Sequence, residues 1–396
     1  MQHKEIRPVF IIVLLCLISS AGRFVIDSYL PSLPSIQYEL VLSHALVQMT
    51  LTIYLLGLGF SQLFYGPLSD RFGRRKVLIL GMFVFLIGNT LCANASSGKE
   101  LLFARLISGI GAGACGVLNR LIASDCFKGP AFAKAWSYTT TVLVLTLIFA
   151  PLMGGYIQEW YGWSGNFTAC SIFVAAVLAV VLVLLPETNL HIGKHKHGIF
   201  ETLRNYAVAF TSFSFLVPTF AYMFAFAGLI AYFQVSPLLL INHYAWTPVE
   251  YGWSSLVIAL SYLLGGNIVQ YCVYKVGVST MLRYGLMAGL FGGVFLFISA
   301  RWLAGHAWFI VICSSVYALG ARLVIPNASA LAMGTSIVPK GCVAALVGAI
   351  QMLGAVLLSS LMAQFKTNTA QPLAIFLISI STVALVLCYF MKDNGK

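Results

Sequence analysis

Charged side chains inside long apolar stretches are the first candidates for chemistry in this sequence. Asp27 follows Arg23 by four residues, a spacing that places both side chains on one face of a helix. Arg105 and Arg322 interrupt two other apolar stretches. Burial of a carboxylate favours its protonated form, whereas a nearby guanidinium favours the ionised form. An Asp whose Arg partner moves could therefore load and unload protons, and guanidinium groups match the geometry of carboxylates and phosphates.

A second group of candidates is the polar run GPLSDRFGRRK at 66–76. Gly66 and Gly73 flank a tight turn, Asp70 lies between them, and basic residues follow. An acid near a helix amino terminus is favoured by the helix dipole, and we expect Arg71 and Arg74 to be the charge partners of Asp70. The spacing is more specific than that of an ordinary basic loop.

Composition shows what surroundings these residues need. Of 396 residues, 60% are hydrophobic and 9% are charged, whereas soluble domains average about a quarter charged residues. So few charges cannot cover the surface of a soluble protein of this size. We therefore predict a polytopic membrane protein whose solvent is the lipid bilayer.

The sequence contains twelve apolar stretches that are long enough to span a bilayer. The longest polar interruption follows the sixth stretch. The predicted organisation is an amino-terminal six-helix bundle over 1–190, a cytoplasmic linker over 191–210 and a carboxy-terminal six-helix bundle over 211–396. The predicted spans are 8–30, 45–66, 77–95, 100–123, 134–157, 166–186, 211–236, 250–274, 279–300, 306–330, 341–364 and 370–391.

Lys and Arg indicate the orientation of these spans. With a cytoplasmic amino terminus, 17 of the 23 basic residues lie inside, three lie outside and three lie within spans. This bias predicts that both termini are cytoplasmic. The net charge of +12 then belongs to loops near the anionic inner leaflet, and we expect no nucleic-acid partner.

Several enzyme classes find no support in the sequence. Gly109, Gly111 and Gly113 form a GxGxG string, but no strand is expected before it and no phosphate-binding GxxxxGK[ST] motif occurs. We interpret these glycines as positions of close helix approach. The nine Cys and seven His form no paired or metal-binding spacing. We expect no metal, no cofactor and no catalytic residues; an ion gradient is the natural energy source.

The run at 66–76 resembles the loop between helices 2 and 3 of the major facilitator superfamily, in which a Gly, an Asp, a second Gly and basic residues recur. RLISGIGAGACGVLNRLIASD at 105–125 is similar to that family's fourth helix, and APLMGG at 150–155 is similar to the Gly-Pro-x-x-Gly-Gly element of its antiporters. DSYLPSLP at 27–34, LPET at 185–188 and YFQVSP at 232–237 resemble drug exporters of the bicyclomycin-resistance type. The sequence departs from the family pattern at Ala150, which replaces a Gly, and at Ser164, which replaces an Arg.

The resemblance implies an all-α integral membrane protein with twelve helices in two six-helix bundles. It also implies proton-coupled efflux of small drug-like or metabolite molecules by alternating access, across the inner membrane of a bacterium. The loop Asp of the family holds one conformation of the two halves, and we carry this role to Asp70. The implied conformational-switch residues are Gly66, Asp70, Arg71, Gly73, Arg74, Pro151, Gly154 and Gly155.

Charges within spans are costly and usually functional. We predict that Asp27 binds the coupling proton and that Arg105 is its switchable partner. The alternative is a permanent Arg–Asp pair that fixes two helices together. Three Arg and one Asp within the spans favour anionic, zwitterionic or neutral substrates. Arg322 could instead extend its side chain to the inner lipid headgroups.

Aromatic and amide side chains in the spans complete the candidate binding site, because such groups suit drug-like ligands. The chain is expected to act as a monomer. A dedicated exporter of an anionic metabolite, such as a carboxylate siderophore, is an alternative that the surplus of Arg favours; an uptake symporter is disfavoured by APLMGG. The predicted substrate-binding residues are Arg23, Arg322, Tyr54, Tyr138, Tyr222, Phe226, Tyr232, Gln234, Asn267, Asn327 and Gln351.

Overall fold

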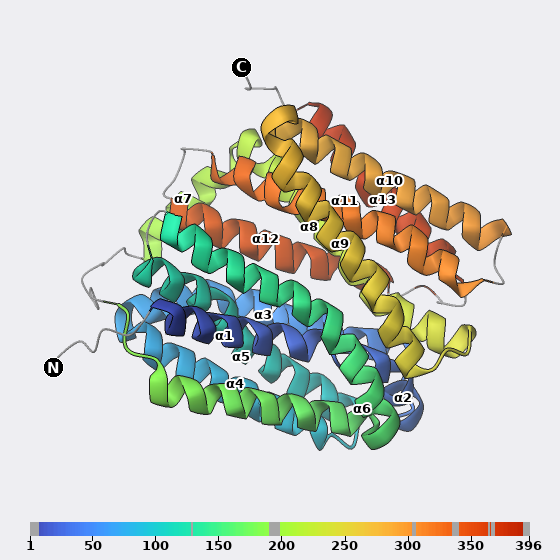
Figure 1. Ribbon diagram of the computed structural model, residues 1–396, viewed down its shortest axis with the longest axis horizontal. Helices are drawn as coiled ribbons and strands as arrows, with labels where there is room; N and C mark the ends of the chain where they lie inside the picture. Colours follow the sequence, from blue (N-terminus) through green and yellow to red (C-terminus); the bar gives the residue numbers. More distant parts are fainter. Residues whose placement is uncertain are drawn as a thin grey trace. The chain divides into compact units, whose positions relative to one another are not determined.

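The computed structural model describes residues 8–127, 130–189, 199–302, 306–334, 340–362, 365 and 369–390, and its regular elements there are helices (Figure 1). The first half of the chain forms α1 (Pro8–Asp27), η1 (Leu30–Ser32), α2 (Leu33–Glu39), α3 (His44–Phe72), α4 (Arg74–Ala93), α5 (Gly98–Cys126) and α6 (Pro130–Leu184). The second half forms α7 (Ile199–Phe210), α8 (Phe213–Pro237), η2 (Leu238–His243), α9 (Pro248–Val276), α10 (Val278–Trp302), α11 (Ala307–Met333), α12 (Lys340–Met362) and α13 (Gln371–Tyr389).

The helices agree with most of the predicted spans, and the main differences concern α1, α6 and α12. Ten stretches of the described residues are long and apolar enough to cross a membrane. One of them, within α6, covers the two predicted spans 134–157 and 166–186, because α6 continues through a kink at Gly162. The predicted span 341–364 corresponds to α12, whose apolar part is Leu346–Met362.

Two local features explain where the helices bend. Gly162 has φ 70°, a conformation that suits glycine, and it divides α6 into two arms. Pro31 and Pro34 lie at the starts of η1 and α2, where the missing N–H of proline costs nothing. The predicted first span, 8–30, therefore ends as a helix at Asp27 and continues through η1 into α2.

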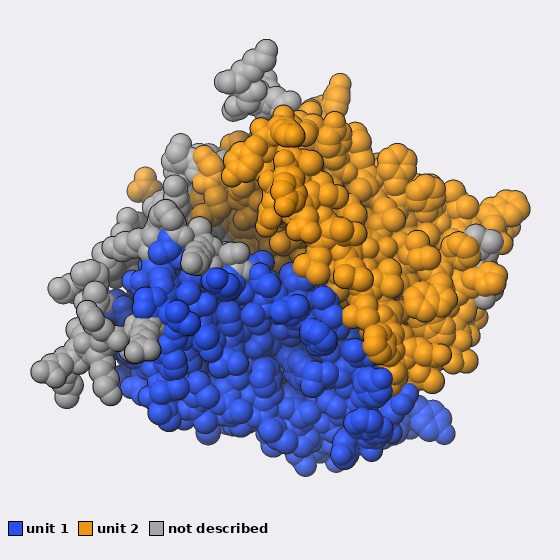
Figure 2. All heavy atoms as spheres, in the orientation of Figure 1, with its two compact units in different colours: residues 1–41, 53–196 blue, residues 42–52, 197–396 orange. Residues whose placement is uncertain are grey.

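The chain forms two compact units (Figure 2). Unit 1 contains residues 1–41 and 53–196, and unit 2 contains residues 42–52 and 197–396. The first part of α3 thus groups with unit 2, although the sequence pattern assigned it to the amino-terminal bundle. Of the predicted linker 191–210, residues 191–198 lie outside the described residues, and 199–210 form α7.

Within unit 1, α4 packs along α5 and α1 packs along α6. A Cβ atom at Gly109 would lie 2.1 Å from the Tyr54 carbonyl oxygen, and one at Gly111 would lie 2.2 Å from the Phe85 backbone nitrogen. The GxGxG string therefore allows α5 to approach α3 and α4 closely, which confirms the interpretation made from the sequence. In unit 2, α10 packs against α11 and α13, and α8 packs against α11 and α12.

Candidate functional site

Asp27 ends α1 and is completely buried in unit 1. Its Oδ2 lies 2.6 Å from Nε of Arg23, one helical turn earlier, and the Arg23 side chain is 24% exposed. The other carboxylate oxygen, Oδ1, has no hydrogen-bond partner among the described residues. A buried carboxylate with one oxygen in an ion pair and the other unbonded can exchange a proton without loss of a second hydrogen bond.

The second arm of α6 and Gly154 in its first arm hold this end of α1. A Cβ atom at Gly154 would lie 1.8 Å from the carbonyl oxygen of Ser28, so α1 rests directly on the α6 backbone. Asn166 donates from Nδ2 to the Gly154 carbonyl oxygen (3.0 Å) and to Oγ of Ser32 (2.6 Å). Oγ of Ser28 lies 3.2 Å from Sγ of Cys170. These contacts fix the backbone that follows Asp27.

Arg105, on α5, is fully buried among aromatic rings. Its Cζ lies 4.1 Å from the centroid of the Tyr29 ring, 4.3 Å from that of Tyr54 and 5.7 Å from that of Phe167. A desolvated cation–π contact contributes about 2 kcal/mol. Tyr54 lies within electrostatic reach of both Asp27 and Arg105, so the two charges share one neighbour. The ion pair of Asp27 in this structure is with Arg23, and an exchange between Asp27 and Arg105 stays a prediction.

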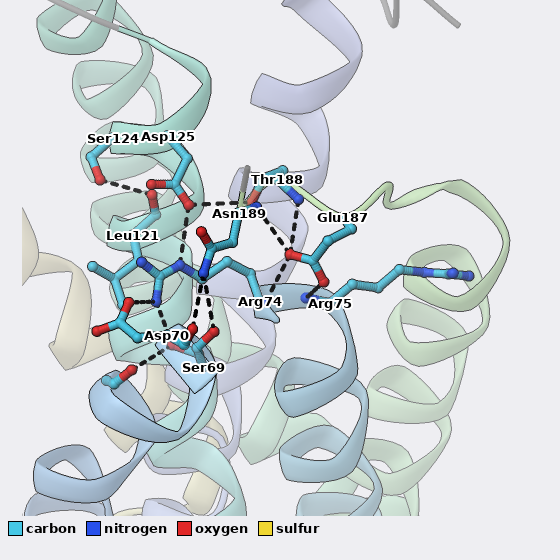
Figure 3. Close-up of polar contacts among 11 residues, drawn as sticks. Ser69, Asp70, Arg74, Arg75, Leu121, Ser124, Asp125, Glu187, Thr188 and Asn189 are labelled. Atoms are coloured by element: carbon cyan, nitrogen blue, oxygen red, sulfur yellow. Dashed lines mark hydrogen bonds and ion pairs between the residues drawn. The ribbon is translucent and has the colours of Figure 1, made fainter. Parts of the chain in front are cut away.

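A polar cluster lies at the other end of unit 1, where α3 meets α4 (Figure 3). Arg74 begins α4 and is nearly buried. Its Nη1 lies 2.6 Å from Oδ1 of Asp70 and donates to Oγ of Ser69, also at 2.6 Å. Its Nε lies 3.1 Å from Oδ2 of Asp125 at the end of α5. One guanidinium therefore connects α3, α4 and α5.

Glu187 caps α4 from the segment after α6 (Figure 3). Its Oε1 accepts from the Arg74 backbone N–H (2.8 Å) and its Oε2 from that of Arg75 (3.2 Å). A carboxylate at this position satisfies helix amino-terminal N–H groups and complements the helix dipole. Gly73 has φ 97°, and a Cβ atom there would lie 2.3 Å from Oε2 of Glu187. Only glycine therefore fits beside the capping carboxylate.

The sequence pattern predicts part of this cluster. The pairing of Asp70 with Arg74 is present, and it crosses the break between the two helices, because Asp70 lies in the last turn of α3 and Arg74 begins α4. Arg71 instead places its guanidinium 5.2 Å from the centroid of the Phe72 ring. Glu187 and Asp125 also belong to the cluster, and the sequence pattern does not predict their contacts. Glu187 lies 113 residues from Arg74, so only its place in the LPET run hinted at a role.

The other predicted switch residues lie in different settings. Gly66 has open space where a Cβ atom would be, so no close approach requires glycine there. Pro151, Gly154 and Gly155 lie in the first arm of α6, and of these Gly154 makes the close approach to α1 described above.

The structure distributes the predicted substrate-binding residues over both units. In unit 1, Tyr54 is fully buried and Tyr138 is half-exposed. In unit 2, Asn267 is exposed and Tyr222 and Phe226 are half-buried. Gln234 donates to Oγ1 of Thr52 at 2.9 Å. The buried ones in unit 2 are Tyr232, Gln234, Asn327 and Gln351.

The side chain of Arg322, on α11, packs against α9. Its Cζ is 5.0 Å from the centroid of the Tyr262 ring, and Cβ atoms built at Gly265 and Gly266 would lie 2.9 Å from its Cβ and 3.1 Å from its Nε. The ion pairs of the described residues do not include it. Within the same part of the chain, no group of three His, Cys, Asp or Glu residues is arranged to hold a metal ion.

Comparison with known proteins agrees with this architecture. The sequence model described as Major Facilitator Superfamily matches residues 12–363. The Bicyclomycin resistance protein homolog of Haemophilus influenzae is 28% identical over 394 residues, which cover 100% of this chain and 98% of that protein. Multidrug resistance protein D of Escherichia coli is 25% identical over 98% of this chain and 96% of its own length.

The crystal structure of a D-xylose-proton symporter aligns with a TM-score of 0.80 at 15% identity, over 98% of this chain and 99% of that one. At this identity the likeness concerns the fold alone. Together with the family match, it confirms the predicted all-α fold of twelve membrane helices.

Proposed function

The chain belongs to the major facilitator superfamily and is a secondary transporter rather than an enzyme, and we propose that it exports small molecules in exchange for protons. The relatives whose names refer to bicyclomycin and multidrug resistance support drug-like substrates and the outward direction. In this proposal the protein acts by alternating access in the inner membrane of a bacterium, with both termini cytoplasmic and the proton gradient as its energy source.

The observation that carries the proposal is the environment of Asp27. Its carboxylate is fully buried, is held by Arg23 through one oxygen and has no hydrogen-bond partner for the other among the described residues. Intramembrane acids in such settings commonly serve as proton sites. Because Arg23 lies on the same helix, protonation of Asp27 would release a guanidinium within α1 itself. Tyr54 lies against Arg105 and within electrostatic reach of Asp27. The change of charge at Asp27 would therefore also act on the surroundings of Arg105.

The test is proton movement in proteoliposomes that contain a pH-sensitive dye and carry an imposed pH gradient. One panel of substrates contains lipophilic cations, and the other contains carboxylates and zwitterions. Wild-type protein should move protons when a substrate is added. Asp27→Asn preserves the shape of the side chain and its hydrogen bond from Arg23 but cannot bind the proton, so it should abolish this movement.

Glu159→Gln provides the matched control, because Glu159 is an exposed acid on α6. It should retain the proton movement of the wild type. If Asp27→Asn is folded and moves protons as fast as Glu159→Gln, Asp27 is not the coupling group.

A dedicated exporter of an anionic metabolite, such as a carboxylate siderophore, is the second candidate function. The observation that favours it is Arg322, whose charge no described carboxylate neutralises. Proton movement with one class of carboxylates only would support this candidate, whereas movement with many unrelated compounds would support a multidrug antiporter.

A further inference from the structure

Arg322 lies deep in a membrane helix and has no acidic partner among the described residues of its unit. It follows the start of α11 by 15 residues and precedes its end by 11, which corresponds to about 23 Å and about 17 Å of helix. The described side chains of unit 2 include one carboxylate, that of Glu250. Glu250 caps the start of α9 with Thr247, about 18 Å of helix from Tyr262.

The neighbouring helix fixes the Arg322 side chain without neutralising its charge. Gly265 and Gly266 follow Tyr262 by three and four residues on α9, so they lie on the same face as its ring. Gly265 lies against the base of the side chain, Gly266 lies against Nε, and the Tyr262 ring lies 5.0 Å from Cζ. A guanidinium that is held by its stem and one flank keeps its remaining N–H groups for another partner.

The accessibility of those N–H groups agrees with this arrangement. The side chain is half-buried, and its nitrogen atoms are not among the fully buried atoms that have no hydrogen-bond partner. The hydrogen bonds of the described residues do not involve them either, so these nitrogen atoms keep some accessible surface. A membrane-embedded guanidinium that is preorganised, accessible and not neutralised is suited to bidentate binding of an oxyanion.

We infer that Arg322, held by Tyr262 and Gly266, binds a carboxylate group of the transported substrate. This inference rests on the proposed function and adds a substrate class to it. Tyr262 and Gly266 are positioning residues, because they act through the guanidinium. The same oxyanion chemistry exists in lipid phosphates, and the experiment therefore separates the two sources.

The test measures equilibrium binding of two planar probes to the purified full-length protein in nanodiscs of phosphatidylcholine. 2-Naphthoate carries the carboxylate, and 2-naphthamide is its neutral isostere. We expect wild-type protein to bind 2-naphthoate more tightly than 2-naphthamide. Arg322→Lys keeps the charge but removes the two-pronged geometry, so it should weaken 2-naphthoate binding about tenfold and leave 2-naphthamide binding within about twofold.

A second variant tests the positioning without removal of the guanidinium. Gly266→Ala places a methyl group 3.1 Å from Nε, which must displace the guanidinium by a few tenths of an ångström. It should weaken 2-naphthoate binding in the same direction as Arg322→Lys. Gly334→Ala is the matched control, because its Cβ atom would make only ordinary contacts of 3.4 Å, and it should bind both probes as the wild type does.

Two results would overturn the inference. The first is equal affinity of the wild type for the two probes, or an equal loss for both in folded Arg322→Lys. The second is loss of the difference in 2-naphthoate binding between the wild type and Arg322→Lys when phosphatidylglycerol is added at an ionic strength that screens the surface charge, which would assign Arg322 to the phosphate of an anionic lipid. Binding needs no gradient, so Arg322-dependent binding combined with failure of Asp27-dependent proton movement would contradict the proposed function alone.

Discussion

At the scale of single residues, Arg74 shows how one side chain organises the cluster between α3 and α4. Its Nη1 contacts Asp70 and Ser69, its Nε contacts Asp125, and its backbone N–H donates to Glu187. A lysine could keep the charge but not the fork that reaches two carboxylates at once. The cluster therefore depends on arginine at this position.

We predict that Arg74→Lys lowers the free energy of unfolding by about 1–3 kcal/mol, since the cluster is partly exposed to solvent through Asp70 and Asp125. Arg71→Lys should change it by less than about 0.5 kcal/mol, because Arg71 is exposed and its guanidinium lies 5.2 Å from the centroid of the adjacent Phe72 ring. Thermal unfolding in detergent measures both. Equal shifts of the unfolding temperature for the two variants would contradict the larger stabilising role that we assign to Arg74.

The separation of two residues along the sequence decides which contacts of this cluster could be predicted. Asp70 and Arg74 could be paired from the sequence because they are four residues apart, on either side of the tight turn that the glycine spacing predicts. Glu187 could not, because its contact with α4 depends on the length and kink of α6. The turn explains Gly73 in part, because its φ of 97° suits glycine. Tertiary structure adds a second reason, since a Cβ atom there would collide with the Glu187 carboxylate.

At the scale of elements, the close approach of α6 to α1 links an antiporter-like motif to the candidate proton site. APLMGG was assigned a conformational role from its resemblance alone. The structure gives its Gly154 a specific neighbour, the Ser28 carbonyl oxygen, directly after Asp27. The helix spans themselves could be predicted because bilayer crossing demands long apolar runs. The seating of α1 on α6 could not, because it depends on the positive φ of Gly162 and on which faces the two arms present.

Gly154→Ala should therefore displace the carboxy-terminal end of α1, since its Cβ atom would lie 1.8 Å from a backbone oxygen. Overpacking of this kind costs about 1–3 kcal/mol, and we expect proton movement in proteoliposomes to fall at least about tenfold as Asp27 shifts. Gly116→Ala is the control, because its Cβ atom would lie 3.4 Å from the Gln62 side chain. Unchanged proton movement in Gly154→Ala would show that the APLMGG motif does not position Asp27 for proton coupling.

At the scale of the whole molecule, the distribution of basic residues makes a prediction about topology. With the amino terminus inside, 17 of 23 Lys and Arg lie on the cytoplasmic side, and the Arg74 cluster lies there with them. The bias could be computed from the sequence once the spans were known, because it requires only the order of spans and loops. The grouping of residues 42–52 with unit 2 has no such sequence signal, since it arises from packing rather than from hydropathy.

Reporter fusions test this orientation directly. Green fluorescent protein fused after the last residue should fluoresce, because it folds in the cytoplasm, and alkaline phosphatase at the same position should be inactive. Alkaline phosphatase inserted at Ser97, between α4 and α5, should be active, because that loop is expected outside. An inserted reporter also divides the chain, so truncation after Ser97 with the reporter attached is the matched control and should give the same activity. The reverse pattern would place Arg74, Asp125 and Glu187 on the outer side and Asp27 near the cytoplasm, which would contradict proton entry from outside through Asp27.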